Sequence, residues 1–159
     1  MNSIGQSERT TQNRVIQLFQ DKLRYRYLGN WHDREDNRNI EPALLTAFLQ
    51  QNYSDNLITK ALHKLHQAAG VPSLYEANKA VYSLLRYGVD VQPDIGRHKE
   101  TVHLIDWKNP QNNDFALAEE VSIKGVHNKR PDLVLYVNGI ALAVLEIKRS
   151  TVAAAEGIR

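Results

Sequence analysis

Two carboxylates and one ammonium group near the end of the sequence have the types and spacing of a site that cleaves phosphodiesters. Asp132 follows a proline at the start of an apolar run, and Glu146 and Lys148 close the next apolar run with one residue between them. Carboxylate oxygens are preferred ligands of Mg²⁺, which activates water and offsets charge on phosphorus. A neighbouring lysine can orient the attacking water or stabilise the developing charge. These residues therefore predict metal-assisted phosphodiester hydrolysis.

The two apolar runs are expected to form a hairpin with Asn138-Gly139 at its turn. Side chains two apart on a strand share a face, so Glu146 and Lys148 project together. A two-residue turn would place Asp132 on the other face. We therefore expect a three-residue loop, which sets Asp132 opposite Val144 and on the face of Glu146, or an equivalent bulge.

Two alternatives to this site remain open. The same three residues could be a turn residue beside a solvated or buried ion pair, because the spacing alone occurs by chance. A second proline-aspartate is followed by D-x-K at Asp94, Asp106 and Lys108. No hairpin turn joins two apolar strands between them, so this second set is the weaker candidate.

The first half of the chain has helical periodicity, and its ends carry helix signals. Ser54 and Ser73 are expected N-caps, and Gly70 and Gly88 are expected to end the same two helices. The stretch from 27 to 39 has turn composition and is expected to be a loop. The expected helices are 10–27, 41–52, a third that runs from the Ser54 cap through 57–70, and a fourth that runs from the Ser73 and Glu76 capping box through 77–88.

The second half changes to short runs rich in branched residues, which predict strands within 101–107, 115–125, 131–139 and 141–149. The last two runs are apolar on both faces, which favours central, covered strands. Glu119 and Glu120 are expected at exposed strand positions, and Trp31 and Trp107 are expected to be packing residues rather than stacking platforms. The order of elements predicts an α/β (α+β) fold, with a mixed central sheet flanked by helices and a helical N-terminal half.

Composition supports one globular domain. The 159 residues are 42% hydrophobic and 24% charged, with a formal net charge of +2 and no cysteine. Thiolate metal sites, disulfides and a cysteine nucleophile are thereby excluded. No apolar run has the length of a membrane span or the form of a secretory signal, so a cytoplasmic protein is expected. We expect a single domain over 1–159, with a helical part at about 1–90 and a sheet core at about 100–159. The uncapped, alanine-rich end suggests a fragment of a longer chain.

At these residues the sequence resembles the PD-(D/E)XK nuclease superfamily. RPDLVLYVNGIALAVLEIKRS is similar to the nuclease core of the R (restriction) subunit of type I restriction enzymes. YLGNWHDREDNRNIEPALLTAFL, LIDWKNPQNNDFALAEEVSIKG and the terminal AAEGIR are similar to the same family's N-terminal region, so the resemblance spans roughly 27–159. It implies a restriction-endonuclease-like core and DNA-translocating, ATP-dependent motor domains beyond this chain.

The resemblance also implies roles for single residues. Asp132 and Glu146 would hold Mg²⁺, with the backbone carbonyl of Ile147 as a further ligand, and Lys148 would complete the catalytic motif. Related nucleases carry a metal-proximal glutamate on the first core helix, for which Glu41 is the candidate here. Glu76 is the alternative, although helix capping explains it more simply. From their place before the motif, Lys129 and Arg130 are the candidate DNA contacts.

The function expected from the resemblance is that of an Mg²⁺-dependent endonuclease domain in a type I restriction complex. Its partners would be double-stranded DNA and the modification and specificity subunits. Two other readings stay open: a stand-alone restriction-like or repair nuclease, and an inactive nuclease fold that only binds DNA.

Overall fold

The computed structural model describes residues 8–123 and 128–148, and the chain divides into two compact units. The first unit, which we call the sheet unit, combines residues up to 40 with those from 114 onward. The second, the helical unit, is Glu41–Asn113. The divide therefore differs from the expected one, because an N-terminal helix and strand belong to the sheet unit.

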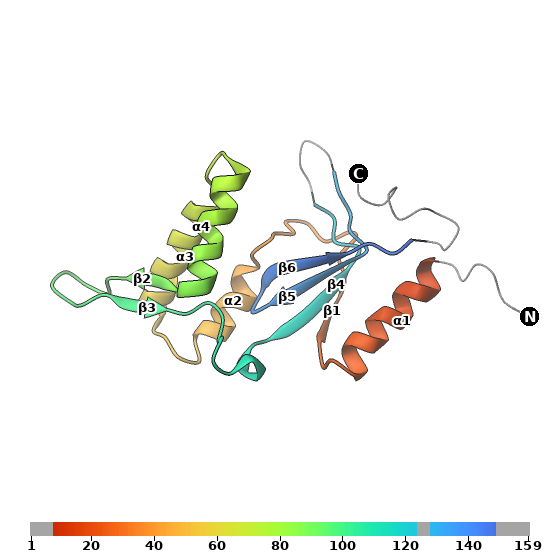
Figure 1. The fold of residues 1–159 in the computed structure, drawn as a ribbon, viewed down its shortest axis with the longest axis horizontal. Coiled ribbons are helices and arrows are strands. Elements are labelled where there is room, and N and C mark those ends of the chain that lie inside the picture. Colours follow the sequence, from red (N-terminus) through yellow and green to blue (C-terminus); the bar gives the residue numbers. More distant parts are fainter. Residues whose placement is uncertain (1–7, 124–127, 149–159) are drawn as a thin grey trace, which may run out of the picture. The chain divides into compact units, whose positions relative to one another are not determined.

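The sheet unit is a four-stranded mixed sheet with one long helix (Figure 1). Its strands lie in the order β1-β4-β5-β6, where β1 pairs parallel to β4 and the other pairs are antiparallel. The elements are α1 (Glu8–Asp21), β1 (Arg26–Asn30), β4 (Phe115–Glu119), β5 (Leu133–Val137) and β6 (Ile140–Leu145). The expected mixed α/β class is confirmed.

Each face of the sheet has its own apolar cluster. Ile16 of α1 packs with Leu117 and Leu133 on one face, and Trp31 packs with Val134 and Tyr136 on the other. Because side chains alternate along β5, this strand contributes residues to both clusters. β5 is central, as expected. β6, however, is the edge of the described sheet, with Leu142 and Val144 46% and 56% exposed. Within residues 8–123 and 128–148, therefore, the expectation that both strands are covered was wrong for β6.

The helical unit contains three helices, a two-stranded sheet and a short 3-10 turn. The capping interaction of Ser73 is confirmed, because its Oγ accepts a hydrogen bond from the Glu76 backbone N–H at 3.4 Å. Ser54 occupies the other N-cap position without a side-chain bond. Gly70 and Gly88 end their helices as expected. The elements are α2 (Pro42–Leu49), α3 (Asp55–Ala69), α4 (Leu74–Tyr87), β2 (Val89–Val91), β3 (Glu100–Val102) and η1 (Pro110–Asn112).

Several expected boundaries were wrong. The first helix stops at Asp21, and the chain then forms β1 within the stretch that turn composition assigned partly to a loop. The strand expected at 101–107 ends at Val102, and the strand expected at 115–125 ends at Glu119. β6 ends at Leu145, so Glu146 and Lys148 lie just past the strand. No helix within the described residues is long and apolar enough to cross a membrane.

The turn of the β5–β6 hairpin has two residues, so the expected three-residue loop was wrong. Val137 pairs with Ile140, and Asn138 and Gly139 both have positive φ, at 52° and 80°. This is the pattern of a type I′ turn. Asn138 is fully buried, and its backbone N–H and side-chain Oδ1 bond the backbone O and N–H of Asp114 at 2.8 and 2.7 Å.

Replacing Asn138 by alanine is therefore expected to lower the free energy of unfolding by about 2–3 kcal/mol. The change removes a buried hydrogen bond and puts a side chain that disfavours positive φ into the turn. Asn138→Gly loses the same bond but tolerates the backbone, so it should cost less than alanine. Urea unfolding of the wild type, Asn138→Ala and Asn138→Gly measures the cost of losing the hydrogen bond and the cost of the positive φ separately. Equal costs for alanine and glycine would contradict the backbone part of this explanation.

Candidate functional site

A β-bulge in β6 brings the two acidic residues to one face of the hairpin. After the turn, the register shifts between Leu135 and Tyr136, whose partners are Ala143 and Ala141. The extra residue inverts the side-chain alternation of β6 beyond the bulge. The last pair is Leu133 with Leu145, so Asp132 and Glu146 occupy the next opposed positions. The equivalent bulge that the sequence allowed is thus confirmed, and Val144 faces Val134 instead of Asp132.

Asp132 is tied directly to the segment that carries the other two residues. Its carboxylate Oδ2 accepts a hydrogen bond from the backbone N–H of Ile147 at 2.6 Å. This bond holds the chain between Glu146 and Lys148 against the start of β5. Lys148 Nζ lies 3.8 Å from Glu146 Oε2, and both side chains are about two-fifths exposed. The three groups of the predicted motif therefore lie together at one edge of the sheet unit.

The electrostatics of Glu146 are those of a carboxylate near other acids. Its pKa is raised by burial first and then by the charge of Asp132, while Lys148 opposes the rise. Glu120 raises the same pKa and Lys129 lowers it. A carboxylate whose pKa is raised by burial and by a neighbouring acid is common at metal and acid–base sites, because a cation relieves the repulsion.

The donor set fits Mg²⁺ in chemical type, since Asp132 and Glu146 offer hard oxygen atoms at one place. Within 8–123 and 128–148, no three acidic or histidine side chains gather closely enough to hold a metal by themselves. Mg²⁺ commonly keeps several waters and binds through one or two carboxylates plus a substrate phosphate. Two carboxylates at an exposed edge meet that requirement.

One residue that sequence reasoning misplaced lies close to this edge of the sheet. Glu119 was expected at an exposed strand position, but it is 4% exposed. Arg9 Nη1 and Gln12 Nε2 donate to its Oε2 at 2.7 and 2.9 Å, and the Tyr27 hydroxyl donates to its Oε1 at 2.6 Å. Glu119 is thus the acceptor for α1 and β1 together. A strand pattern alone gives no signal of such partners, because they come from 92 to 110 positions away along the chain.

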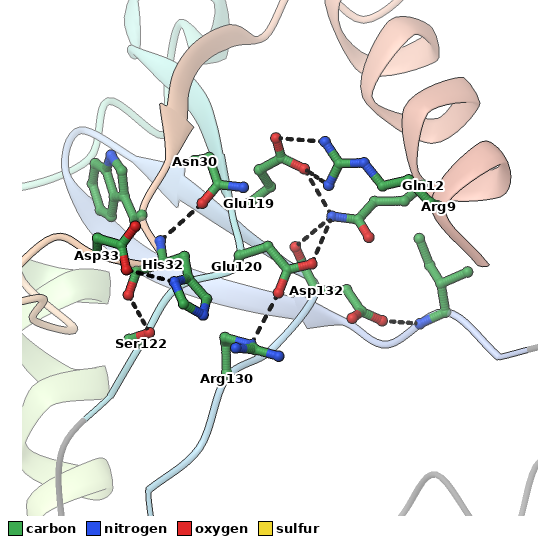
Figure 2. Close-up of polar contacts among 12 residues, drawn as sticks. Arg9, Gln12, Asn30, His32, Asp33, Glu119, Glu120, Ser122, Arg130 and Asp132 are labelled. Atoms are coloured by element: carbon green, nitrogen blue, oxygen red, sulfur yellow. Dashed lines mark hydrogen bonds and ion pairs between the residues drawn. The ribbon is translucent and has the colours of Figure 1, made fainter. Parts of the chain in front are cut away.

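Gln12 connects the ends of two strands (Figure 2). Besides Glu119, its Nε2 lies 3.4 Å from Glu120 Oε1 and 3.4 Å from the backbone carbonyl oxygen of Asp132. The Glu120 backbone N–H donates to that same carbonyl at 2.9 Å. The Gln12 side chain is buried, and it positions the residue that carries the first acid of the motif.

The candidate DNA contacts differ from each other. Lys129 is exposed, and its backbone pairs with that of Ile123. Arg130 Nε lies 3.0 Å from Glu120 Oε2, so its guanidinium is engaged with an acid beside the site. Both residues are exposed and carry a positive charge, as a contact to the DNA backbone requires, and their role in DNA binding stays a prediction.

The remaining candidates lie in the helical unit, except for Trp31 of the sheet unit. Glu41 is buried at the start of α2, and its role as a metal ligand stays a prediction. Asp106 accepts hydrogen bonds from the backbone N–H groups of Lys108 and Asn109 and from the Asn112 amide, so its carboxylate serves its own loop. Trp31 is buried as expected, whereas Trp107 is 49% exposed and the expectation that it packs was wrong.

The Glu119 cluster makes stability depend on pH. Burial raises the pKa of Glu119, but the bonds from Tyr27, Arg9 and Gln12 outweigh it and leave the pKa below its ordinary value. A depressed folded-state pKa gives stability that is present above the unfolded pKa and is lost as pH falls through the folded value. Burial first, and then the bond to Glu119, raises the pKa of Tyr27 to about 12.

Glu119→Gln is expected to lower the free energy of unfolding at pH 7 by about 1–3 kcal/mol, because the bonds to a charged acceptor are weakened. The loss relative to the wild type should begin to shrink as pH falls below about 4.5, where Glu119 of the unfolded chain takes up a proton, and should disappear below the lowered pKa of the folded carboxylate. Urea unfolding between pH 3 and pH 7 measures the difference. Glu100→Gln, at an exposed position of β3, is the control. A pH-independent difference would contradict the assignment.

Comparison with known proteins identifies the family. The family model described as type I restriction enzyme R protein N terminus matches residues 5–159. A putative type I restriction enzyme MjaVIIIP endonuclease subunit of Methanocaldococcus jannaschii is 35% identical over 100 residues, which are 61% of this chain and 9% of that protein. The type I restriction enzyme HindI endonuclease subunit of Haemophilus influenzae is 34% identical over 82 residues, which are 49% of this chain and 8% of that protein. The chain therefore matches only a small part of the length of these relatives, and it belongs to the family of type I restriction enzyme R protein N termini.

Proposed function

We propose that this chain is the DNA-cleaving domain of a type I restriction enzyme endonuclease subunit and hydrolyses phosphodiester bonds in double-stranded DNA with Mg²⁺. The observation that carries the proposal is the meeting of Asp132, Glu146 and Lys148 at the end of one hairpin. The family membership and the names of the relatives support the same activity.

In this proposal Asp132 and Glu146 hold the metal ion, and the backbone carbonyl of Ile147 adds a neutral oxygen ligand. Mg²⁺ supplies a water of lowered pKa and offsets negative charge on the phosphate. The Ile147 N–H fixes the Asp132 carboxylate, which favours one orientation of its second oxygen. Lys148, beside Glu146, orients the attacking water or stabilises the charge that develops on the phosphoryl oxygens.

Phosphate contacts outside the reaction centre are proposed for Lys129 and Arg130. Both lie within three residues of Asp132, and such contacts position DNA without reading its sequence. A phosphate at Arg130 would replace its present partner, Glu120. The proposed partners are the modification and specificity subunits of a cytoplasmic restriction complex, and ATP is proposed to act through motor domains outside this chain.

Cleavage of double-stranded DNA by the intact restriction complex tests the proposal. Cleavage is expected with Mg²⁺ and is expected to stop in the presence of a chelator. Lys148→Ala should slow cleavage by about 100- to 1,000-fold, the range for removing one charge-stabilising donor. Lys22→Ala, an exposed lysine of the sheet unit, is the matched control and should leave the rate unchanged. Metal-independent cleavage, or full activity of Lys148→Ala, would overturn the proposal.

A further inference from the structure

A cavity of about 860 Å³ lies wholly within the helical unit. Its volume is in the range of about 300–1,000 Å³ that small-molecule sites occupy. Its wall includes two aromatic rings, Tyr53 and Trp107, and two cations, Arg86 and Lys108. None of the residues proposed for DNA cleavage at the hairpin lines it. The cavity is therefore a feature that the proposed nuclease site does not use.

The aromatic rings in this wall are held in place while one of them stays open to solvent. Trp107 Nε1 donates to the backbone carbonyl of Leu85 at 2.8 Å, which fixes the indole by its edge. The ring remains 49% exposed. The Tyr53 hydroxyl oxygen accepts a bond from the His103 backbone N–H at 3.0 Å. The Arg86 guanidinium lies over this ring, so the area open to a stacking ligand is the indole surface that Arg86 leaves exposed. Because the ring is already fixed, its use costs little side-chain entropy.

The charge in the wall favours an anion. Asp106 is the acid that lines the cavity, and it accepts bonds from two backbone N–H groups and the Asn112 amide of its own loop. These bonds lower the pKa of Asp106. The Arg86 guanidinium lies 5.5 Å from the centre of the Trp107 ring. Lys108 forms no ion pair with any residue that the structure describes.

Hydrogen-bonding groups complete the wall. In the described part of the chain, the side-chain amides of Gln51 and Asn52 have no hydrogen-bond partner. Each amide offers two donor hydrogens and an acceptor oxygen. A stacking face, an amide edge and unpaired positive charge are together the recognition chemistry of a nucleotide: the ring stacks, the base edge bonds an amide and the phosphate meets the cations.

We infer that this cavity binds a nucleotide, with its base on Trp107 and its phosphate beside Arg86 and Lys108. The ligand is one unit of a single strand or a free mononucleotide, because both carry the same ring and phosphate. This site is separate from the hairpin, so it does not depend on the proposed DNA cleavage.

Photo-crosslinking of the intact protein tests the inference. The probe is a single-stranded thymidine oligonucleotide of about 12 nucleotides that carries 5-iodo-2′-deoxyuridine, and a chelator is present so that cleavage plays no part. Mass spectrometry of the digested protein is expected to find the probe on the peptide that contains Trp107. An excess of thymidine monophosphate removes this crosslink if the site takes a free nucleotide. If only longer strands compete, the site takes a strand.

Variants separate binding in the cavity from general affinity for DNA. Trp107→Ala is expected to reduce crosslinking of the other cavity peptides about tenfold or more through the loss of stacking, while Trp107→Phe retains most of it. Lys108→Gln should weaken probe binding more at low salt than at high salt. Tyr82→Ala, an exposed aromatic of α4 outside the cavity wall, is the control and should change nothing.

Two outcomes would overturn the inference. One is a probe that crosslinks elsewhere or nowhere, with no cavity peptide modified. The other is a cavity shielded from hydroxyl-radical labelling by a protein segment in the absence of nucleic acid, which would make its occupant a protein. Either result leaves the cleavage test at the hairpin unaffected, because that test measures a different site and a different reaction.

Discussion

Asp132→Asn is expected to lower the rate of Mg²⁺-dependent DNA cleavage by at least about 100-fold. Loss of a group that only supports a metal ligand typically costs 10–100-fold, and loss of a ligand itself should cost more. Asparagine keeps the size of the side chain and an oxygen that can accept the bond from the Ile147 N–H. The backbone arrangement should therefore survive, and the change should fall on the charge at the metal site. The measurement is the cleavage rate of the intact complex across a range of Mg²⁺ concentrations.

The chain contains a matched control for this variant. Asp94 also follows a proline and precedes a D-x-K sequence, but it lies in an exposed loop of the helical unit. Asp94→Asn makes the same chemical change and should leave cleavage within about twofold of the wild type, as expected for an exposed position away from a site. Equal losses in the two variants would contradict the assignment of the site to the hairpin. Wild-type cleavage by Asp132→Asn would do so as well.

The sequence allowed the meeting of Asp132, Glu146 and Lys148 to be predicted, because the features that decide it are local. Proline-aspartate, Asn138-Gly139 and E-x-K all belong to one hairpin, so strand alternation alone limits which side chains can meet. The prediction was wrong about how they meet. The two-residue turn puts the acids on opposite faces, and the extra residue between Ala141 and Ala143 returns them to one face. A three-residue loop without a bulge and a two-residue turn with a bulge both put Asp132 and Glu146 on the same face. The residue types in the hairpin did not show which of the two forms.

The support beneath the site could not be predicted, because it depends on contacts between distant segments. β1 has turn-like composition and becomes a strand only by pairing with β4, nearly 90 residues later. Glu119 has the residue type of an exposed position, and three donors from α1 and β1 make its burial favourable. The reverse error occurred at the exposed face of β6. Its apolar residues predicted that another element packs on this face, but the described residues leave it exposed.

Gln12 connects these long-range contacts to the candidate site, because its side chain contacts both Glu119 and the backbone of Asp132. One amide nitrogen lies 2.9 Å from Glu119 Oε2 and 3.4 Å from both Glu120 Oε1 and the Asp132 carbonyl oxygen. All three neighbours are acceptors, and the amide is a neutral donor. The carbonyl it contacts belongs to the residue whose side chain is the first acid of the motif. A substitution that replaces the hydrogen-bond donor of Gln12 by an acceptor should therefore lower stability and shift the position of Asp132.

Gln12→Glu makes that change without altering the shape of the side chain. It is expected to lower the free energy of unfolding at pH 7 by about 2–4 kcal/mol, because a buried acceptor then faces other acceptors and Arg9 must serve two acids. In protein that remains folded, the Mg²⁺ concentration for half-maximal cleavage should rise severalfold more than the maximal rate falls, since Asp132 is displaced and not removed. Urea unfolding and Mg²⁺ titration of cleavage measure the two effects.

Two further variants separate the loss of donation from the added charge. Gln12→Met removes the donor without adding charge and should have an intermediate effect on both measurements. Gln17→Glu adds the same charge at an exposed position of α1 and should leave both unchanged within about 0.5 kcal/mol and twofold. If Gln12→Glu behaved like Gln17→Glu, the amide would have no positioning role. If it lowered stability but left the Mg²⁺ titration unchanged, Gln12 would support the fold alone, and the position of Asp132 would be set entirely by the bond to Ile147.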